Sequence, residues 1–204
     1  MKSIFLHIIS ALFMTMLVSC STNRTHNSEN PPIKTSEVKK EIKTSTDNIE
    51  IPKEKTINKP STPKLKTYSN NLYSISYPSD WICAEHPNDF VDVAFGQEVG
   101  IAYSVFHIDI DAPLKEIVEN GNNDIKSQMN AIVVSHNKIK LCNLEAYKTI
   151  FTFVLANGLK NKQISYTLKN GVTYYNVRFN GSVSDMDKNA DLIETIIQSF
   201  ELKK

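Results

Sequence analysis

The Asn-Gly pair at 170–171 constrains the fold most strongly, because it separates two runs in which apolar and polar residues alternate. Asn-Gly between such runs is typical of a β-hairpin with a two-residue primed turn. We therefore expect Gln163–Lys169 to pair with Val172–Phe179. Pairing Lys169 with Val172 gives one apolar and one largely polar face; the apolar pairs are then Tyr166 with Tyr175 and Ile164 with Val177.

A second Asn-Gly pair, at 157–158, extends this hairpin into a three-stranded antiparallel meander. It predicts that Tyr147–Ala156 pairs with Leu159–Leu168. In this register Phe151 and Phe153 fall on the same side as Ile164 and Tyr166.

Earlier segments predict further strands and a helix. Alternation indicates strands at Leu72–Tyr77, Phe90–Phe95 and Ile101–Ile110. Asp111 followed by Pro113 is typical of a helix start, with Asp111 as the N-cap. Gly121 weakens that helix, so we expect a kink or break there.

A last helix is expected near the C-terminus, where Ser184 and Asp187 form a candidate capping box. Its apolar stripe recurs at helical spacing and consists of Met186, Ala190, Ile193, Ile197 and Phe200. Strands, an inserted helix, a meander and a terminal helix together predict an α+β domain, with an antiparallel sheet packed by helices.

Several local patterns resemble PsbP-like domains. Residues 73–81 read YSISYPSDW, and later resemblances lie at 141–147, 171–175 and 196–200. The resemblance covers about residues 66–202 and implies a PsbP-like α/β/α sandwich. The family includes the extrinsic photosystem II subunit, the Ran-binding Mog proteins and bacterial lipoproteins, but its motifs here are structural and assign no activity to particular residues. One departure is Asn143, which stands where the family has a glycine.

The N-terminus resembles a bacterial lipoprotein signal peptide. A short apolar run from Ile4 to Val18 follows Lys2 and ends in a lipobox-like Leu17–Cys20, with small Ser19 before the cysteine. The run is shorter than the roughly 20 residues of a spanning helix. We expect cleavage after residue 19 and a diacylglycerol and an N-acyl chain, such as palmitate, on Cys20. An ordinary signal peptide or an uncleaved anchor is the alternative.

Residues 20–66 have the composition of a tether between this anchor and the domain. Ser21–Lys66 contains no glycine or aromatic residue, and Lys, Thr, Ser, Asn, Glu and Pro dominate. Such a segment buries too little apolar surface to offset its ordering entropy, so we expect one folded domain at 67–204. The tether has a net charge of +4 and the domain −4, and an acidic domain argues against nucleic acid as a partner.

One group of residues could bind a divalent metal ion. His107, Asp109 and Asp111 alternate along a predicted strand end, so an imidazole and two carboxylates could share one face. The alternative is a solvated strand end, in which Asp111 acts as the helix cap.

Two cysteines remain in the predicted domain. Cys83 and Cys142 could form a disulfide in an oxidising envelope or remain as two buried thiols. Trp81, with Tyr73 and Tyr77, could stack on a ligand or form a corner of the core.

The sequence contains no nucleophile elbow, P-loop, HExxH or CxxC motif. We therefore expect a non-catalytic binding or assembly module in the cell envelope, without a cofactor, anchored to the bilayer through Cys20 and engaging a protein partner. Small-ligand binding, metal binding and an unrecognised active site remain alternatives. Ser21 is not the aspartate that retains enterobacterial lipoproteins at the inner membrane, which favours an outer membrane where the cell has one.

Overall fold

The computed structural model describes residues 63–203; the predicted signal peptide, Cys20 and the predicted tether as far as residue 62 lie outside them. The first described strand begins at Leu65, two residues before the predicted start of the domain. The described elements are β1 (Leu65–Ser69), β2 (Tyr73–Pro78), β3 (Ile82–Asn88), β4 (Val91–Gly96), β5 (Ala102–Asp109), α2 (Leu114–Met129), β6 (Ile132–Leu141), β7 (Leu144–Val154), β8 (Lys160–Asn170), β9 (Thr173–Ser182), α3 (Val183–Lys188), α4 (Ala190–Gln198) and β10 (Glu201–Leu202). Within residues 63–203 no helix is long and apolar enough to cross a membrane.

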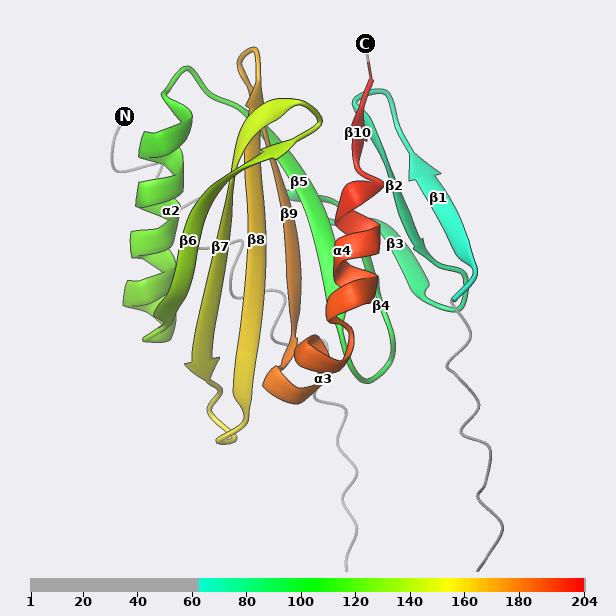
Figure 1. The fold of residues 1–204 in the computed structure, drawn as a ribbon, viewed down its shortest axis with the longest axis vertical. Helices are drawn as coiled ribbons and strands as arrows, with labels where there is room; N and C mark the ends of the chain where they lie inside the picture. The colour runs from blue at the N-terminus through cyan, green and yellow to red at the C-terminus, as the bar shows by residue number, and fades with distance from the viewer. Residues whose placement is uncertain (1–62, 204) are drawn as a thin grey trace, which may run out of the picture. The chain divides into compact units, whose positions relative to one another are not determined.

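Two antiparallel sheets form the domain (Figure 1). The larger sheet has seven strands in the order β3-β4-β5-β9-β8-β7-β6, and the smaller one has the order β1-β2-β10. Each described pairing is antiparallel. The predicted α+β class is therefore confirmed.

Helices cover both faces of the large sheet. On one face α3, α4 and the small sheet pack in a core that includes Tyr73, Ile164, Phe179 and Ile196. On the opposite face lies α2, where Ile125 packs with residues of β7 in a smaller apolar cluster. Figure 1 shows α2 and the α3–α4 pair as separate layers against the strands.

The β8–β9 hairpin exists, but its predicted register is wrong. Asn170 pairs with Thr173, so Gly171 and Val172 form the turn, and Tyr166 lies opposite Val177 instead of Tyr175. Gly171 has a φ of 62°, as the first central residue of a type II′ turn requires. The shift is two residues along β9, so the apolar and polar faces stay as predicted.

The β7–β8 hairpin reverses a predicted face. The strands close through Val154 paired with Lys160, and the Leu155 amide donates to the Leu159 carbonyl at 2.9 Å. This loop is longer than a two-residue turn and changes the register by an odd number of residues, which moves side chains to the opposite face. Phe151 and Phe153 therefore face α2, while Ile164 and Tyr166 belong to the other core.

Helix α2 is continuous, so the break expected at Gly121 is wrong. Val118 and Ile125, on either side of the glycine, are both buried, and their packing offsets its low helix propensity. The predicted cap is also wrong, because the N-cap residue is Pro113, with no side-chain cap bond.

The C-terminal helix is divided at Asn189, and its capping box lies two residues earlier than predicted. The Ser182 hydroxyl oxygen accepts from the Asp185 amide at 3.0 Å and donates to its carboxylate at 2.7 Å. The chain leaves β9 directly into α3, so the last strand residue serves as the cap. Of the predicted stripe, only Ala190 is exposed.

The departure at Asn143 has a conformational explanation. Cys142 and Asn143 form the β6–β7 turn, between paired Leu141 and Leu144, and have φ values of 51° and 63°. Positive φ at both central residues defines a type I′ turn, in which asparagine is the commonest substitute for glycine.

Candidate functional site: a cavity beneath α2

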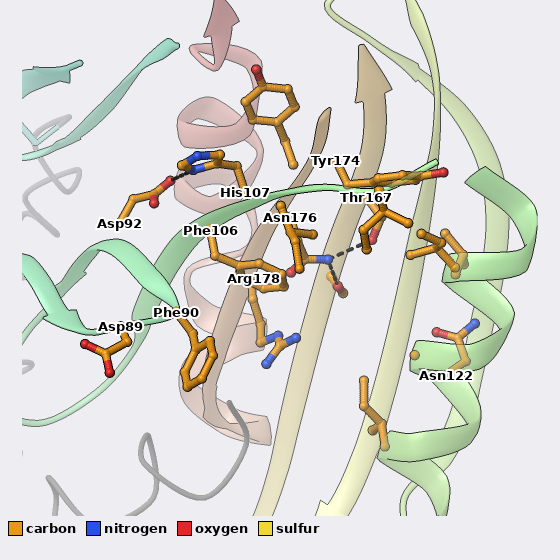
Figure 2. Close-up of a pocket in the computed structure, with 18 residues that line it drawn as sticks. Asp89, Phe90, Asp92, Phe106, His107, Asn122, Thr167, Tyr174, Asn176 and Arg178 are labelled. Carbon is orange, nitrogen blue, oxygen red and sulfur yellow. Dashed lines mark hydrogen bonds and ion pairs between the residues drawn. The ribbon is translucent and has the colours of Figure 1, made fainter. Parts of the chain in front are cut away.

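A cavity of about 410 Å³ lies between α2 and the large sheet, and we call it the α2 cavity (Figure 2). Strands β5, β9 and β8 contribute its floor, and the β3–β4 turn forms part of its rim. Its apolar lining comes from both sides of the space and includes Phe106, Ile108, Ile110, Ile117, Val118 and Ile125.

The cavity forms where the sheet divides. Pairing between β4 and β5 stops at Val93 and Val105, whereas β5 continues beside β9 as far as Asp109. The free part of β5 therefore borders an opening, which the turn carrying Phe90 approaches from one side and α2 from the other.

The floor of the α2 cavity is polar, although it is buried. Asn176 is 7% exposed and Ser165 is 6% exposed. The Asn176 side-chain amide donates to the hydroxyl oxygens of Ser165 and Thr167, each at 2.7 Å. Its carbonyl oxygen Oδ1 is buried without a hydrogen-bond partner among the described residues, which is costly unless something else satisfies it.

Arg178 adds a positive charge to this floor. The residue is 8% exposed, and its guanidinium carbon lies 5.3 Å from the centre of the Phe106 ring. Burial lowers the pKa of Arg178 to about 10, because desolvation disfavours the charged form. The side chain still carries its charge at neutral pH.

A Tyr–Asp–His group lies at the rim. The Asp92 carboxylate accepts from the Tyr73 hydroxyl at 3.2 Å and lies 2.8 Å from His107 Nδ1. Burial and the charge of Asp92 raise the pKa of Tyr73, so this phenol stays protonated and donates. These bonds fix His107 beside the α2 cavity.

The N-terminal end of α2 is attached to the β8–β9 hairpin. Both the Tyr174 hydroxyl and the Lys169 amine donate to the Ala112 carbonyl, the latter at 2.7 Å. Lys169 also lies over the Tyr174 ring. These two hydrogen bonds hold the N-terminal end of the helix to the sheet. Tyr174 also lines the α2 cavity.

The structure does not bring the candidate metal ligands together. His107 contacts Asp92, Asp109 accepts from the Thr173 hydroxyl at 2.6 Å, and Asp111 is exposed beyond the strand. In the part of the chain that the structure describes, no three His, Cys, Asp or Glu side chains are grouped to hold a metal ion.

The contacts of the other candidate residues indicate structural roles. Cys83 and Cys142 are both free thiols, and Cys142 donates to the Phe200 carbonyl at 3.0 Å. Trp81 and Tyr73 are buried in the core, and the Tyr77 ring packs against the Phe95 ring there in a tilted arrangement. The core-corner interpretation of Trp81 is therefore the one the structure supports.

The α2 cavity was not foreseen from the sequence, although one signal was available. The polar face of β8 and β9 was recognised, but nothing local indicated that a helix would cover it. The chain has only two arginines, Arg24 and Arg178, among 23 Lys and Arg residues. Arg178 is the one arginine of residues 67–204 and lies on β9, an inner strand of the sheet, where a charged side chain is unusual.

Comparisons with known proteins establish the fold. No family model and no curated protein matches the chain. The solved structure of cyanobacterial PsbP (CyanoP) from Synechocystis sp. PCC 6803 matches with a TM-score of 0.55 and 15% identity, covering 73% of this chain and 98% of that one. The domain thus has the PsbP-like fold that its sequence motifs predicted.

More distant matches also exist. A protein of unknown function from Pseudomonas aeruginosa has a TM-score of 0.44 at 12% identity, covering 66% of this chain and 94% of its own. LpqN, involved in cell envelope biogenesis of Mycobacterium tuberculosis, has a TM-score of 0.43 at 9% identity, covering 72% and 88%. The fold assignment rests on the cyanobacterial structure alone.

Proposed function

We propose that the chain is a lipid-anchored protein of the bacterial cell envelope whose PsbP-like domain binds a small ligand in the α2 cavity. The observation that carries this proposal is a space of about 410 Å³ with apolar walls and a few buried polar groups. Small-molecule sites have this size and this combination of surfaces.

The polar groups of the floor suit binding better than catalysis. Ser165 and Thr167 both contact Asn176, whose neutral amide cannot remove a proton from a hydroxyl. His107 is held by Asp92 at the rim. We therefore assign the domain a non-catalytic role.

An apolar probe tests ligand binding. The full-length protein in lipid nanodiscs would be unfolded by heat with and without decanol, following the fluorescence of Trp81. This residue is the one tryptophan of the chain and is buried in the core, so its emission reports unfolding of the domain. A ligand that binds only the folded state raises the unfolding temperature.

A filled cavity supplies the control. Gly121 lines the α2 cavity, and a Cβ atom there would have no neighbour within 4 Å. Decanol should stabilise the wild type and the matched variant Asn123→Phe, which places phenylalanine at an exposed position of the same helix. It should not stabilise Gly121→Phe. Equal stabilisation of all three proteins, or of none, would refute the proposed function.

Anchorage through Cys20 is a separate part of the proposal. It is supported by the lipobox-like sequence Leu17–Cys20, and two or more acyl chains give stable membrane attachment. Intact mass spectrometry of the wild type should show a chain that begins at Cys20 and carries diacylglycerol. A mature chain without lipid, or one that retains Met1, would contradict it.

A protein partner is a second candidate function, favoured by the edge strand β6. Strand β6 ends the order of the large sheet, and its Ile132 and Val134 are 69% and 60% exposed. Unpaired edges with exposed apolar residues favour pairing with another chain. Crosslinking in intact envelopes should capture a partner with the wild type and lose it with Val134→Lys; unchanged capture would exclude this edge.

A further inference from the structure

We infer that the ligand of the α2 cavity is an uncharged amphiphile whose hydroxyl or amide N–H donates a hydrogen bond to Asn176 Oδ1 and whose alkyl tail lies beneath α2. This inference rests on the proposed ligand-binding function and adds the chemistry of the head group and the atom that recognises it. It follows from an unsatisfied acceptor on the cavity floor, from its place in the sheet and from the residues around it.

Asn176 has an acceptor that its neighbours do not use. Its amide nitrogen Nδ2 carries two hydrogens, and Figure 2 shows the two bonds that it makes, to the hydroxyl oxygens of Ser165 and Thr167. Oδ1 is left buried without a partner among the described residues, on a side chain whose residue is 7% exposed. Because an unsatisfied buried acceptor is costly, a ligand that donates to it relieves this cost on binding.

The sheet places this acceptor in the middle of the cavity floor. Asn176, on β9, pairs with Phe106 of β5 on one side and with Thr167 of β8 on the other. Directly opposed residues of antiparallel strands share one face, and all three of these residues line the α2 cavity. Strands therefore flank Asn176 on both sides, and the space from which a new partner can reach it is the cavity beneath α2.

The groups around Asn176 favour an uncharged donor. The acidic residues that line the α2 cavity are Asp89 and Asp92; Figure 2 shows both toward the β3–β4 turn, away from Asn176, and Asp92 contacts His107. A cationic head group at the neutral amide would be buried without a counter-ion, which costs far more than burying a hydroxyl. A carboxylate has no hydrogen to donate and would leave Oδ1 unsatisfied.

The apolar part of the α2 cavity limits the tail. A volume of about 410 Å³, at roughly 30 Å³ for each water-sized group, holds about a dozen non-hydrogen atoms. A ten-carbon alcohol has this size. The walls on both sides suit an alkyl chain, because they consist of Ile117 and Val118 from α2 and Phe106 and Ile108 from β5.

Two isomeric probes isolate the donor. Decanol and methyl nonyl ether have the same molecular formula, but the ether oxygen carries no hydrogen. The full-length protein in lipid nanodiscs would be unfolded by heat with each probe, following Trp81, and affinities would be referred to the free probe in the aqueous phase. Decanol should bind about tenfold more tightly than the ether, as expected for a hydrogen bond to a buried acceptor. In an apolar cavity without a free acceptor the order is the reverse, because the alcohol loses its bonds to water.

A substitution at Asn176 tests the acceptor itself. Asn176→Leu removes Oδ1 but keeps a side chain of similar size, so it should bind the ether at least as tightly as decanol. The matched control is Gln163→Leu, which removes another buried amide on β8 that is not among the residues lining the α2 cavity. This control should keep the preference for decanol. If Asn176→Leu does not fold, the isomeric pair on the wild type still decides.

The outcomes separate the two proposals. Equal binding of the isomers to the wild type, or tighter binding of the ether, lost in Gly121→Phe but kept in Asn123→Phe, would leave ligand binding intact and overturn the donor head group. An amide turned by 180°, or a water molecule on Oδ1, would give that result. A preference for decanol that persists in Asn176→Leu would overturn the assignment to Asn176. Binding of neither probe would overturn both proposals.

Discussion

The two faces of the large sheet are built from the same strands but packed in different ways. The face beneath α3 and α4 is closed by apolar side chains, with Ile164, Phe179 and Ile196 at 7%, 0% and 0% exposure. The face beneath α2 carries Ser165, Asn176 and Arg178 on neighbouring strands and encloses a cavity. The first face holds the domain together, and the second has open space and a buried acceptor, Asn176 Oδ1, that no described residue satisfies.

The largest expected difference comes from the same substitution on each face. Ile196→Ala, on α4, removes a fully buried side chain and should lower the free energy of unfolding by about 2–5 kcal/mol. Ile117→Ala, on α2, should cost clearly less, because Ile117 is half-buried and already borders open space. Chemical denaturation followed at Trp81 measures both. Equal losses would mean that the two faces are packed alike.

Replacing a glycine by alanine should change the free energy of unfolding in opposite directions on the two faces. A Cβ at Gly181 would lie 2.9 Å from Ile101 Cγ2 and 3.2 Å from the Gly100 carbonyl oxygen, so Gly181→Ala should cost about 1–3 kcal/mol through overpacking.

At Gly121 the same addition meets no atom within 4 Å. Gly121→Ala should therefore stabilise the domain by about 0.5–1 kcal/mol, through helix propensity and a less flexible unfolded chain. Denaturation curves of the two variants and the wild type decide the matter. A loss of stability at both positions would show that the space beneath α2 closes in solution.

The two faces should also contribute differently to stability in alkaline solution, because each contains a buried titratable group. Burial raises the pKa of Tyr103, whose hydroxyl donates to the Ser76 carbonyl at 2.7 Å. Above about pH 10 the unfolded chain loses this proton and the folded domain keeps it, so stability is complete below pH 10 and falls as the pH rises. Tyr103→Phe should reduce the fall by about 1 kcal/mol at pH 11.

Arg178 acts in the opposite direction. Its folded-state pKa of about 10 is lowered by burial, so between pH 10 and the usual arginine range the unfolded state holds more protons, and stability gains from this group as the pH rises. Urea denaturation between pH 8 and 11 measures the net slope. An identical slope in Tyr103→Phe and wild type would show that Tyr103 titrates normally in the folded domain.

Residue alternation predicted the strands of the meander because it is a local property. Ile164 and Tyr166 were placed on the correct face of β8 even though the turn begins at Gly171, since a shift of two residues preserves the face. Phe151 was placed on the wrong face because the β7–β8 loop changes the register by an odd number. Turn length, and not residue type, limited this part of the prediction.

The α2 cavity depends on contacts that no local pattern contains. Ser165 and Asn176 belong to the polar face of the predicted hairpin, and residue alternation does not show that α2 covers this face. His107 likewise contacts Asp92, which lies on another strand, and not the two aspartates that follow it in the sequence. Both cases require knowledge of which strands are neighbours.

Hydrogen exchange of the full-length protein in nanodiscs, with and without decanol, tests most directly whether the face beneath α2 is the binding face. We predict that decanol slows exchange along α2, around Gly121, and leaves α4 and β2 unchanged relative to the unliganded protein. Gly121→Phe should abolish this protection. Protection confined to α4 and the small sheet, or none under saturating decanol, would contradict the assignment of the binding site to the α2 cavity.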